Sequence, residues 1–525
     1  MNGAQALINT LVEGGVEVCF ANPGTSEMHF VAALDSVPAM RGVLTLFEGV
    51  ATGAADGYAR ISGRPAAVLL HLGPGLGNGL ANLHNARRAH TPVVNIVGDH
   101  ATYHKQYDAP LESDIDSVAG TVSGWVRRTE RVEDVGTDAA AAIAAALGPP
   151  GQVATLMLPA DVSWGPGANP APQLASPAQA ALPVAAEAVD AAAKALRSGE
   201  PAVLLIGGAA TREPGLSAAA RIAEATGAKL LCETFPARLE RGEGLPVVGR
   251  LGYLAEMANY QLGGAKHLVL AGARSPVTFF AYPGQPSVLV PEGCEVHVLA
   301  EPEGSPVAAL AQLADELAPD TVAPTAPANR PELPTGALTT ETAAAAVGAL
   351  LPEGAIVVDE ANTSGLTLPA ATEGAPRHDW LTLTGGAIGY GLPCATGAAV
   401  AAPDRPVLCL QADGSAMYTI SALWTQAREN LNVTTVIYNN SAYAILRLEL
   451  QKVGAETVGE DGAPGPKARE LLDLSHPNLD FVALATGMGV PAVRATTSEE
   501  LTAALANAFA EPGPHLIDAI VPSLL

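Results

Sequence analysis

Charge is scarce in this chain, and positive charge is scarcest. Only 15% of the 525 residues are charged, acidic residues outnumber lysine and arginine by 53 to 28, and no run of lysine and arginine occurs. With a net charge of −25, a basic patch would require strong local clustering of the few basic residues. We therefore expect neither nucleic acid nor a membrane surface as a partner.

Cysteine is also rare, and its five copies are scattered and lie mostly within apolar runs: Cys19, Cys232, Cys294, Cys394 and Cys409. This pattern indicates buried free thiols in a reducing cytoplasm. No CxxC motif or Cys/His cluster in the sequence suggests zinc. The first residues, MNGAQALINTLVEGGV, contain neither a basic region nor a long apolar span. We expect no signal peptide or membrane anchor, and a cytoplasmic location.

The length and the proline-rich stretches predict several domains. Hydrophobic residues make up 48% of the chain, and 525 residues are too many for one core. Residues 164–183 and 318–334 are rich in proline without apolar periodicity, which marks domain boundaries. Elsewhere short apolar strands alternate with helices. We predict an α/β protein with three domains, each a doubly wound, mostly parallel sheet flanked by helices: residues 1–165, 183–318 and 335–525.

Two local predictions concern single segments. The glycine-rich GPGLGNG at residues 73–79 is expected to form a turn between a strand and a helix. Val288–Val290 is expected to form a short strand of the central domain.

The richest stretch for function runs from residue 407 to 447. Two apolar runs, Val407–Leu410 and Val433–Tyr438, read as buried strands joined by a helix. In a parallel sheet their carboxyl ends meet at one edge. Asp413 follows the first strand and Asn440 the second, so a carboxylate and a carboxamide are expected close together. Oxygen ligands of this kind suit Mg²⁺ that carries a phosphate, and the amides that open the helix would face the phosphate. The alternative is an ordinary strand–helix–strand unit with polar turns.

The amino-acid sequence of this stretch resembles that of a known family. DGSAMYTISALW and NNSAYAILR are similar to the diphosphate-binding motif of thiamine-diphosphate enzymes, in particular benzoylformate decarboxylase and the large subunit of acetohydroxyacid synthase. The resemblance implies thiamine diphosphate and Mg²⁺ as cofactors, with Asp413, Asn440 and the main-chain oxygen of Ala442 as metal ligands. Gly414 and Ser415 would contact the diphosphate. The family usually has glycine where this chain has Ala412, so the turn is expected to differ slightly.

Glu48 is the expected activating acid. It follows a short apolar run in TLFEGVATGAADGYAR, at the start of a helix. Thiamine-diphosphate chemistry requires a carboxyl group beside the pyrimidine ring of the cofactor, and Glu48 matches the family's activating glutamate in the same context. Taken without that resemblance, Glu48 is a helix N-terminal carboxylate stabilised by the helix dipole.

Other cofactor contacts are assigned by resemblance alone. In the loop GGAIGYGLP, Ile388 would be the wedge that bends the cofactor, and the Gly386 carbonyl would hold its amino group. The alternative is a glycine-rich turn before a helix. Asn362 and Thr363 follow another predicted strand and would hydrogen-bond the diphosphate, with turn capping as an equal alternative.

The substrate side is less regular. His71 ends a predicted strand, where benzoylformate decarboxylase also has a histidine, and Thr25 matches that enzyme's active-site serine. A satisfied core histidine and a turn threonine are the alternatives. Phe279 falls at or near the position of the decarboxylase's second catalytic histidine. His100, or its neighbour His104, is the candidate for the missing acid/base, unless both are loop histidines.

These residues lead to one main expectation and two alternatives. A phenyl ring cannot donate a proton, so the sequence favours transfer of an acyl-anion equivalent from a decarboxylated 2-oxo acid to a carbonyl acceptor, as in acetolactate synthase. A simple 2-oxo acid decarboxylase is the first alternative, and a catalytically silent, cofactor-binding regulatory subunit is the second. The resemblance also implies a homodimer or homotetramer with the site at a subunit interface.

Overall fold

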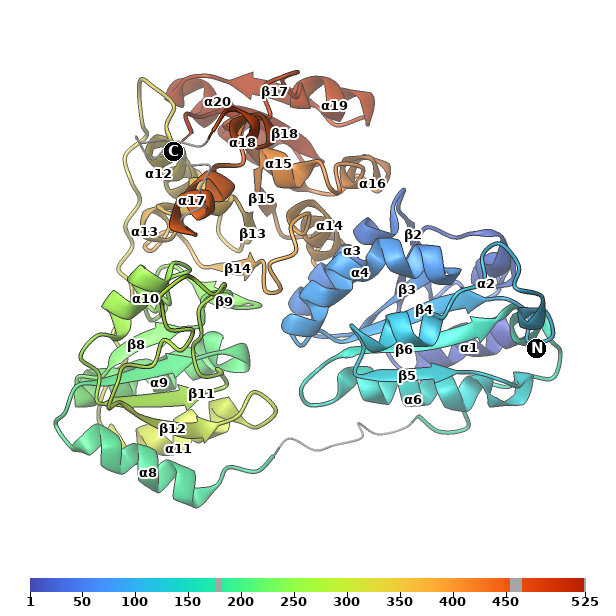
Figure 1. Cartoon of the computed structure of the whole chain (residues 1–525), viewed down its shortest axis with the longest axis horizontal. Coiled ribbons are helices and arrows are strands. Elements are labelled where there is room, and N and C mark those ends of the chain that lie inside the picture. The colour runs from blue at the N-terminus through green and yellow to red at the C-terminus, as the bar shows by residue number, and fades with distance from the viewer. Residues whose placement is uncertain (175–181, 454–464, 524–525) are drawn as a thin grey trace.

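The computed structural model describes residues 1–174, 182–453 and 465–523, which form three sheets flanked by helices (Figure 1). Each sheet takes most of its strands from one of the three predicted segments, so the α/β prediction is confirmed. Within the described residues, no helix is long and apolar enough to cross a membrane.

The N-terminal sheet is six-stranded and parallel, in the order β2-β1-β3-β4-β6-β5. Its strands are β1 (Val18–Ala21), β2 (Arg41–Leu44), β3 (Ala66–His71), β4 (Val93–Asp99), β5 (Trp125–Arg128) and β6 (Val153–Pro159). Its helices are α1 (Gly3–Glu13), α2 (Met28–Leu34), α3 (Glu48–Ser62), α4 (Leu72–Arg88), α5 (Ile115–Gly120), α6 (Val135–Leu147) and α7 (Ala160–Trp164). Every residue of β4 and β6 is buried, because helices cover both faces of the sheet.

The central sheet has five strands in the order β10-β8-β7-β11-β12, all parallel. They are β7 (Ala202–Ile206), β8 (Lys229–Cys232), β10 (Gly249–Arg250), β11 (His267–Ala271) and β12 (Glu295–Ala300). The helices here are α8 (Ala186–Arg197), α9 (Glu213–Thr226), α10 (Ala255–Leu262) and α11 (Pro306–Leu317). The prediction of a strand at Val288–Val290 is wrong, because only an isolated bridge joins Val288 to Val277.

The C-terminal sheet has seven strands in the order β17-β18-β16-β15-β13-β14-β9. They are β13 (Ile356–Glu360), β14 (His378–Thr382), β15 (Val407–Ala412), β16 (Val433–Asn439), β17 (Ala492–Ala495), β18 (His515–Ile520) and the antiparallel β9 (Leu239–Arg241). Its helices are α12 (Thr340–Leu350), α13 (Leu368–Ala371), α14 (Gly391–Ala401), α15 (Asp413–Ala416), α16 (Ala422–Arg428), α17 (Ala444–Lys452), α18 (Pro466–Leu471), α19 (Phe481–Gly487) and α20 (Ser498–Ala510). Because β9 lies in the middle of the central segment, that segment contributes an edge strand to the C-terminal sheet.

Small residues let α3 and α14 pack closely, and this contact joins the N-terminal and C-terminal sheets (Figure 1). A Cβ atom on Gly57 would lie 2.1 Å from the Cys394 carbonyl oxygen, and one on Gly397 would lie 1.8 Å from the Ala54 carbonyl oxygen. One hydrophobic core therefore extends from β3 and β4 through the two helices to β13 and β15.

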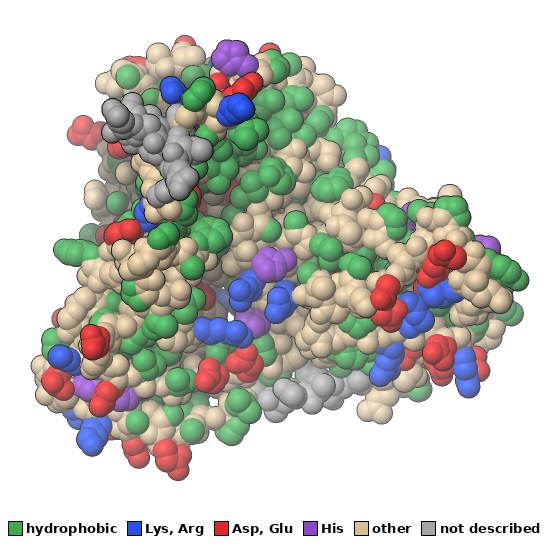
Figure 2. All heavy atoms as spheres, in the orientation of Figure 1, with side chains coloured by type: hydrophobic (Ala, Val, Ile, Leu, Met, Phe, Trp, Pro, Cys, Tyr) green, Lys and Arg blue, Asp and Glu red, His purple; other side chains and the backbone are tan. Residues whose placement is uncertain are grey.

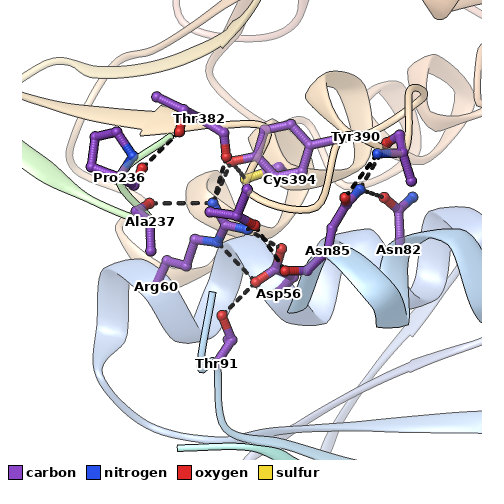
Figure 3. Close-up of polar contacts among 12 residues, drawn as sticks. Asp56, Arg60, Asn82, Asn85, Thr91, Pro236, Ala237, Thr382, Tyr390 and Cys394 are labelled. Atoms are coloured by element: carbon purple, nitrogen blue, oxygen red, sulfur yellow. Dashed lines mark hydrogen bonds and ion pairs between the residues drawn. The ribbon is translucent and has the colours of Figure 1, made fainter. Parts of the chain in front are cut away.

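A fully buried ion pair fixes the junction of all three segments (Figure 3). Two guanidinium nitrogens of Arg60 lie 2.9 and 2.6 Å from the two carboxylate oxygens of Asp56, one helical turn earlier on α3. Arg60 also donates to the carbonyl oxygens of Ala237 and Thr382, at 3.2 and 2.8 Å, and to the Tyr390 hydroxyl at 3.0 Å. Burial alone would lower the pKa of Arg60, but the Asp56 carboxylate raises it above its ordinary value, so the pair stays ionised.

Candidate active site

A cavity of about 860 Å³ lies between the C-terminal sheet and the central segment. Nine of the residues predicted to bind the cofactor or metal line it: Asn362, Thr363, Gly386, Ile388, Asp413, Gly414, Ser415, Asn440 and Ala442. They follow the carboxyl ends of β13, β14, β15 and β16; Asp413, Gly414 and Ser415 belong to the short helix α15, and the others to connecting segments. The structure therefore brings together side chains that are spread over 80 positions of sequence, from residue 362 to residue 442.

Asp413 and Asn440 meet as the parallel pairing of β15 and β16 predicts. Asp413 is 2% exposed, and its two oxygens accept the backbone N–H groups of Gly414, Asn440 and Ser441 at 2.7, 3.1 and 2.7 Å. The Asn440 side-chain oxygen accepts the Ala442 N–H at 3.0 Å. Among the described residues no basic side chain pairs with Asp413, and burial raises the pKa of its carboxyl group. A buried carboxylate of this kind favours a bound cation.

The loop that carries Gly386 and Ile388 is held from two sides. Glu360, at the end of β13, accepts the N–H groups of Gly389 and Gly391 at 2.7 and 2.6 Å. Asn85 of α4 donates to the Ala387 carbonyl at 2.8 Å. Burial raises the pKa of Glu360, although its hydrogen bonds counteract this. Buried hydrogen bonds from Glu360 and Asn85 therefore hold this loop at the cavity wall.

Gly386 lies directly against an aromatic ring of the central segment. Its φ is +71°, and a Cβ atom built on it would lie 2.6 Å from the Phe279 ring. Phe279 packs with Phe235, Tyr253 and Phe280, with ring centroids 5.0 to 6.0 Å apart. The wall opposite the Gly386 loop is therefore aromatic, and Phe279 lines the same cavity as Asp413.

The predicted catalytic residues form a second group, at the carboxyl edge of the N-terminal sheet. None of Glu48, His71, Thr25 and His100 lines the 860 Å³ cavity within one chain. Glu48 begins α3, is 8% exposed, and accepts a hydrogen bond from the Asn78 side chain at 3.0 Å. The GPGLGNG segment that contains Asn78 lies inside α4, so the prediction of a turn there is wrong. The helix displays Asn78 toward Glu48.

His71 has a carboxylate partner that sequence reasoning missed. Glu27 is 3% exposed, and one of its oxygens lies 2.9 Å from His71 Nδ1. Ser26 Oγ lies 3.1 Å from the same nitrogen. A neutral His71 that donates from Nδ1 to Glu27 presents Nε2 as a proton acceptor. Thr25 is exposed beside this group. Glu27 also accepts the Gly24 N–H at 2.8 Å. In the sequence, the signal that could have pointed to this carboxylate is its position two residues after the predicted site residue Thr25.

His100 follows β4 in a charged neighbourhood. Asp99 is 1% exposed and pairs with Lys105, at 3.2 Å, and with Arg128. These ion pairs explain why an acidic residue is tolerated at the strand end. The Nε2 atom of His100 is buried without a hydrogen-bond partner among the described residues, and the His104 ring lies 5.3 Å away. An acid/base role for His100 stays a prediction.

Comparison with known proteins identifies the family. Residues 1–119 match the model of the N-terminal TPP binding domain of thiamine pyrophosphate enzymes, and residues 367–519 match the C-terminal TPP binding domain. The chain is 74% identical, over the full length of both chains, to "Putative acetolactate synthase large subunit IlvX" of Mycobacterium tuberculosis. It is 31% identical to benzoylformate decarboxylase of Pseudomonas aeruginosa, with 96% of each chain covered. The chain belongs to the thiamine pyrophosphate enzyme family.

A solved member of this family has the same fold. The thiamine diphosphate-dependent 4-hydroxybenzoylformate decarboxylase of Rhodococcus jostii superposes with a TM-score of 0.85, at 26% identity, over 99% of both chains. In the thiamine pyrophosphate enzymes the two matched domains bind the cofactor, which agrees with the cavity at the C-terminal sheet and with Glu48 on the N-terminal sheet. The predicted resemblance is confirmed.

Proposed function

We propose that the protein holds thiamine diphosphate through Mg²⁺ and decarboxylates a 2-oxo acid, passing the acyl-anion equivalent to a carbonyl acceptor. The cofactor, when bound, supplies the carbon nucleophile and the electron sink for loss of carbon dioxide. Asp413, Asn440 and the Ala442 carbonyl would hold the metal, and Gly414 and Ser415 would contact the diphosphate. The buried carboxylate of Asp413, which pairs with no basic side chain among the described residues, supports this assignment.

The aromatic wall is the observation that favours ligation over release of an aldehyde. Phe279 lies against Gly386, where a protonating group would be needed to release an aldehyde, and it has no acidic proton. The neighbouring rings of Phe235 and Tyr253 make that side of the cavity apolar, and Phe279 itself is 43% exposed. An acceptor carbonyl is then the favoured partner for the acyl-anion equivalent.

Simple decarboxylation is the second candidate, and one observation favours it. His71 with its Glu27 partner offers a positioned imidazole, and relatives of this chain include named benzoylformate decarboxylases. Incubation with one 2-oxo acid at a time separates the candidates, because ligation gives a hydroxyketone and decarboxylation an aldehyde. Release of no carbon dioxide from any 2-oxo acid would support the silent regulatory subunit instead. Asp413→Asn, which removes a metal-binding charge, is the inactive control.

We further propose that two chains share each site. Within one chain Glu48 does not line the cavity that contains Asp413. Large apolar side chains near both groups are exposed, among them Leu46, Met417 and Tyr418 (56% exposed), as expected of surfaces that meet a second copy.

Complementation between two inactive variants tests this arrangement. Glu48→Gln and Asp413→Asn are each expected to lose activity. If each site takes Glu48 from one chain and Asp413 from the other, a mixed dimer has one intact site, and random mixing restores about a quarter of the wild-type activity. Co-expressed variants that form mixed dimers but stay inactive would show that both residues act from the same chain.

A further inference from the structure

A second cluster of potential metal ligands lies at the amino ends of β11 and β12, two neighbouring strands of the central sheet (Figure 1). It consists of His267, Glu295 and His297, whose ligand atoms all lie within 4.8 Å of one another. The parallel pairing sets His267 directly beside Glu295, and His297 follows two positions later on the same face of β12. None of the three lines the cavity at Asp413.

The distances suit tetrahedral coordination. His267 Nδ1 lies 3.1 Å from His297 Nε2, and a Glu295 oxygen lies 3.8 Å from each of these nitrogens. Zinc with metal–nitrogen distances of about 2.0 Å separates its tetrahedral ligands by about 3.3 Å. A metal ion therefore fits between the three atoms after a small movement of Glu295, whose side chain is 73% exposed.

A fourth residue orients the first ligand. Glu200, in the loop before β7, lies 3.2 Å from His267 Nε2. A hydrogen bond from that nitrogen to the carboxylate leaves the lone pair of Nδ1 directed at His297 and Glu295. Carboxylates behind metal-bound histidines commonly have this role.

We infer that His267, Glu295 and His297 bind one divalent transition-metal ion, Zn²⁺ above all, with Glu200 as the residue that positions His267. Two imidazole nitrogens favour zinc over Mg²⁺, which prefers oxygen ligands, so this site is chemically distinct from the one at Asp413. The metal would tie β12, the edge strand of the central sheet, to β11. Three protein ligands leave the fourth position to solvent.

Zinc titration of the full-length protein tests the site. Protein freed of zinc and other transition metals, and kept in Mg²⁺ and thiamine diphosphate, is titrated with Zn²⁺ against a chromophoric chelator. We expect one tight equivalent per chain in the wild type, none in His297→Gln, and at least about tenfold weaker binding in Glu295→Gln and Glu200→Gln. Co²⁺ should give tetrahedral visible absorption bands in the wild type only.

His515→Gln is the matched control. His515 also lies near a carboxylate, with Nε2 3.8 Å from Glu511, but no second histidine is paired with it in the described structure. It should bind zinc as the wild type does. Because Glu295 is exposed, Glu295→Gln is expected to fold, which unchanged circular dichroism would verify. Absence of a tight equivalent in the wild type would overturn the inference, as would an unchanged equivalent in both His297→Gln and Glu295→Gln.

Discussion

Phe279 is the side chain whose replacement should change the product most directly. In Phe279→His an imidazole would face the Gly386 loop and supply the proton that the phenyl ring lacks. General acid catalysis typically contributes roughly 10²–10⁴-fold, so aldehyde formation should increase by about tenfold or more relative to hydroxyketone formation. Product ratios from a single 2-oxo acid, measured by nuclear magnetic resonance, check this.

Phe280→His is the control for that experiment. Phe280 lies in the same aromatic cluster and lines the same cavity, but the Phe279 ring separates it from Gly386. Its substitution should leave the product ratio unchanged. If Phe279→His also leaves the ratio unchanged while activity persists, Phe279 does not face the reacting carbon.

Glu233 gives stability a pH dependence. It follows β8, accepts the Gly208 N–H at 3.0 Å, and burial raises its pKa to about 7 from an ordinary value of 4.5. The folded protein therefore keeps this proton at pH values where the unfolded chain loses it. The associated stability is complete below pH 4.5 and declines as pH rises to about 7, by about 3 kcal/mol.

Substitution isolates that contribution. Glu233→Gln cannot ionise, so its free energy of unfolding relative to the wild type should increase between pH 5 and pH 8, roughly the range that the raised pKa defines. Urea denaturation at several pH values measures the difference. A difference that is constant over this range would mean that Glu233 has an ordinary pKa in the folded protein.

At the scale of the elements, hydrophobic periodicity predicted helices and strands correctly wherever burial alone determines the structure. β15 and β16 are buried along almost their whole length, and their parallel pairing places Asp413 beside Asn440 as expected. The prediction of a turn at GPGLGNG is wrong because it was based on the low helix propensity of glycine. In α4 one of these glycines permits a close contact: a Cβ on Gly79 would lie 2.9 Å from Thr52 of α3. Helix packing outweighs the intrinsic preference there.

The contact between α3 and α14 should be equally sensitive to size. In Gly397→Ala the new methyl group would lie 1.8 Å from the Ala54 carbonyl oxygen. Because that oxygen belongs to the backbone of α3, the clash can be relieved only by moving one helix away from the other. Overpacking of this kind costs about 1–3 kcal/mol or more. Gly487→Ala, on α19 with open space around the Cβ position, should instead be neutral or stabilising by about 0.5–1 kcal/mol. Equal thermal unfolding midpoints for the two variants would contradict the close packing.

At the scale of the whole molecule, contacts between residues distant in the chain could not be predicted from the sequence. Glu27 and His71, and likewise His267 and His297, become neighbours only through strand order and register. The motif AADGYAR was recognised by resemblance, but its physical reason is the buried pair of Asp56 and Arg60. The net charge of −25 likewise does not predict where basic side chains cluster. In the folded chain they gather in the hollow between the N-terminal and central segments (Figure 2).

The buried pair carries the strongest prediction about the assembled chain. Arg60→Met keeps much of the side-chain volume but leaves Asp56, fully buried, without its cation. Breaking such a pair costs about 3–5 kcal/mol. Because Arg60 also holds Thr382 and Tyr390, on either side of the Gly386 loop, cofactor affinity should fall together with stability.

Two further variants separate the ion pair from the helix that carries it. Arg64→Met removes an arginine of the same segment whose partner, Glu17, is as exposed as itself, and should cost less than about 1 kcal/mol. Asp56→Asn combined with Arg60→Met should recover part of the stability lost in Arg60→Met, since no unpaired charge then remains buried. Urea denaturation of the four proteins measures both comparisons. A double variant that is no more stable than Arg60→Met would mean that the loss arises from the contacts of Arg60 with the other two segments, and that the junction depends on those hydrogen bonds more than on the pair.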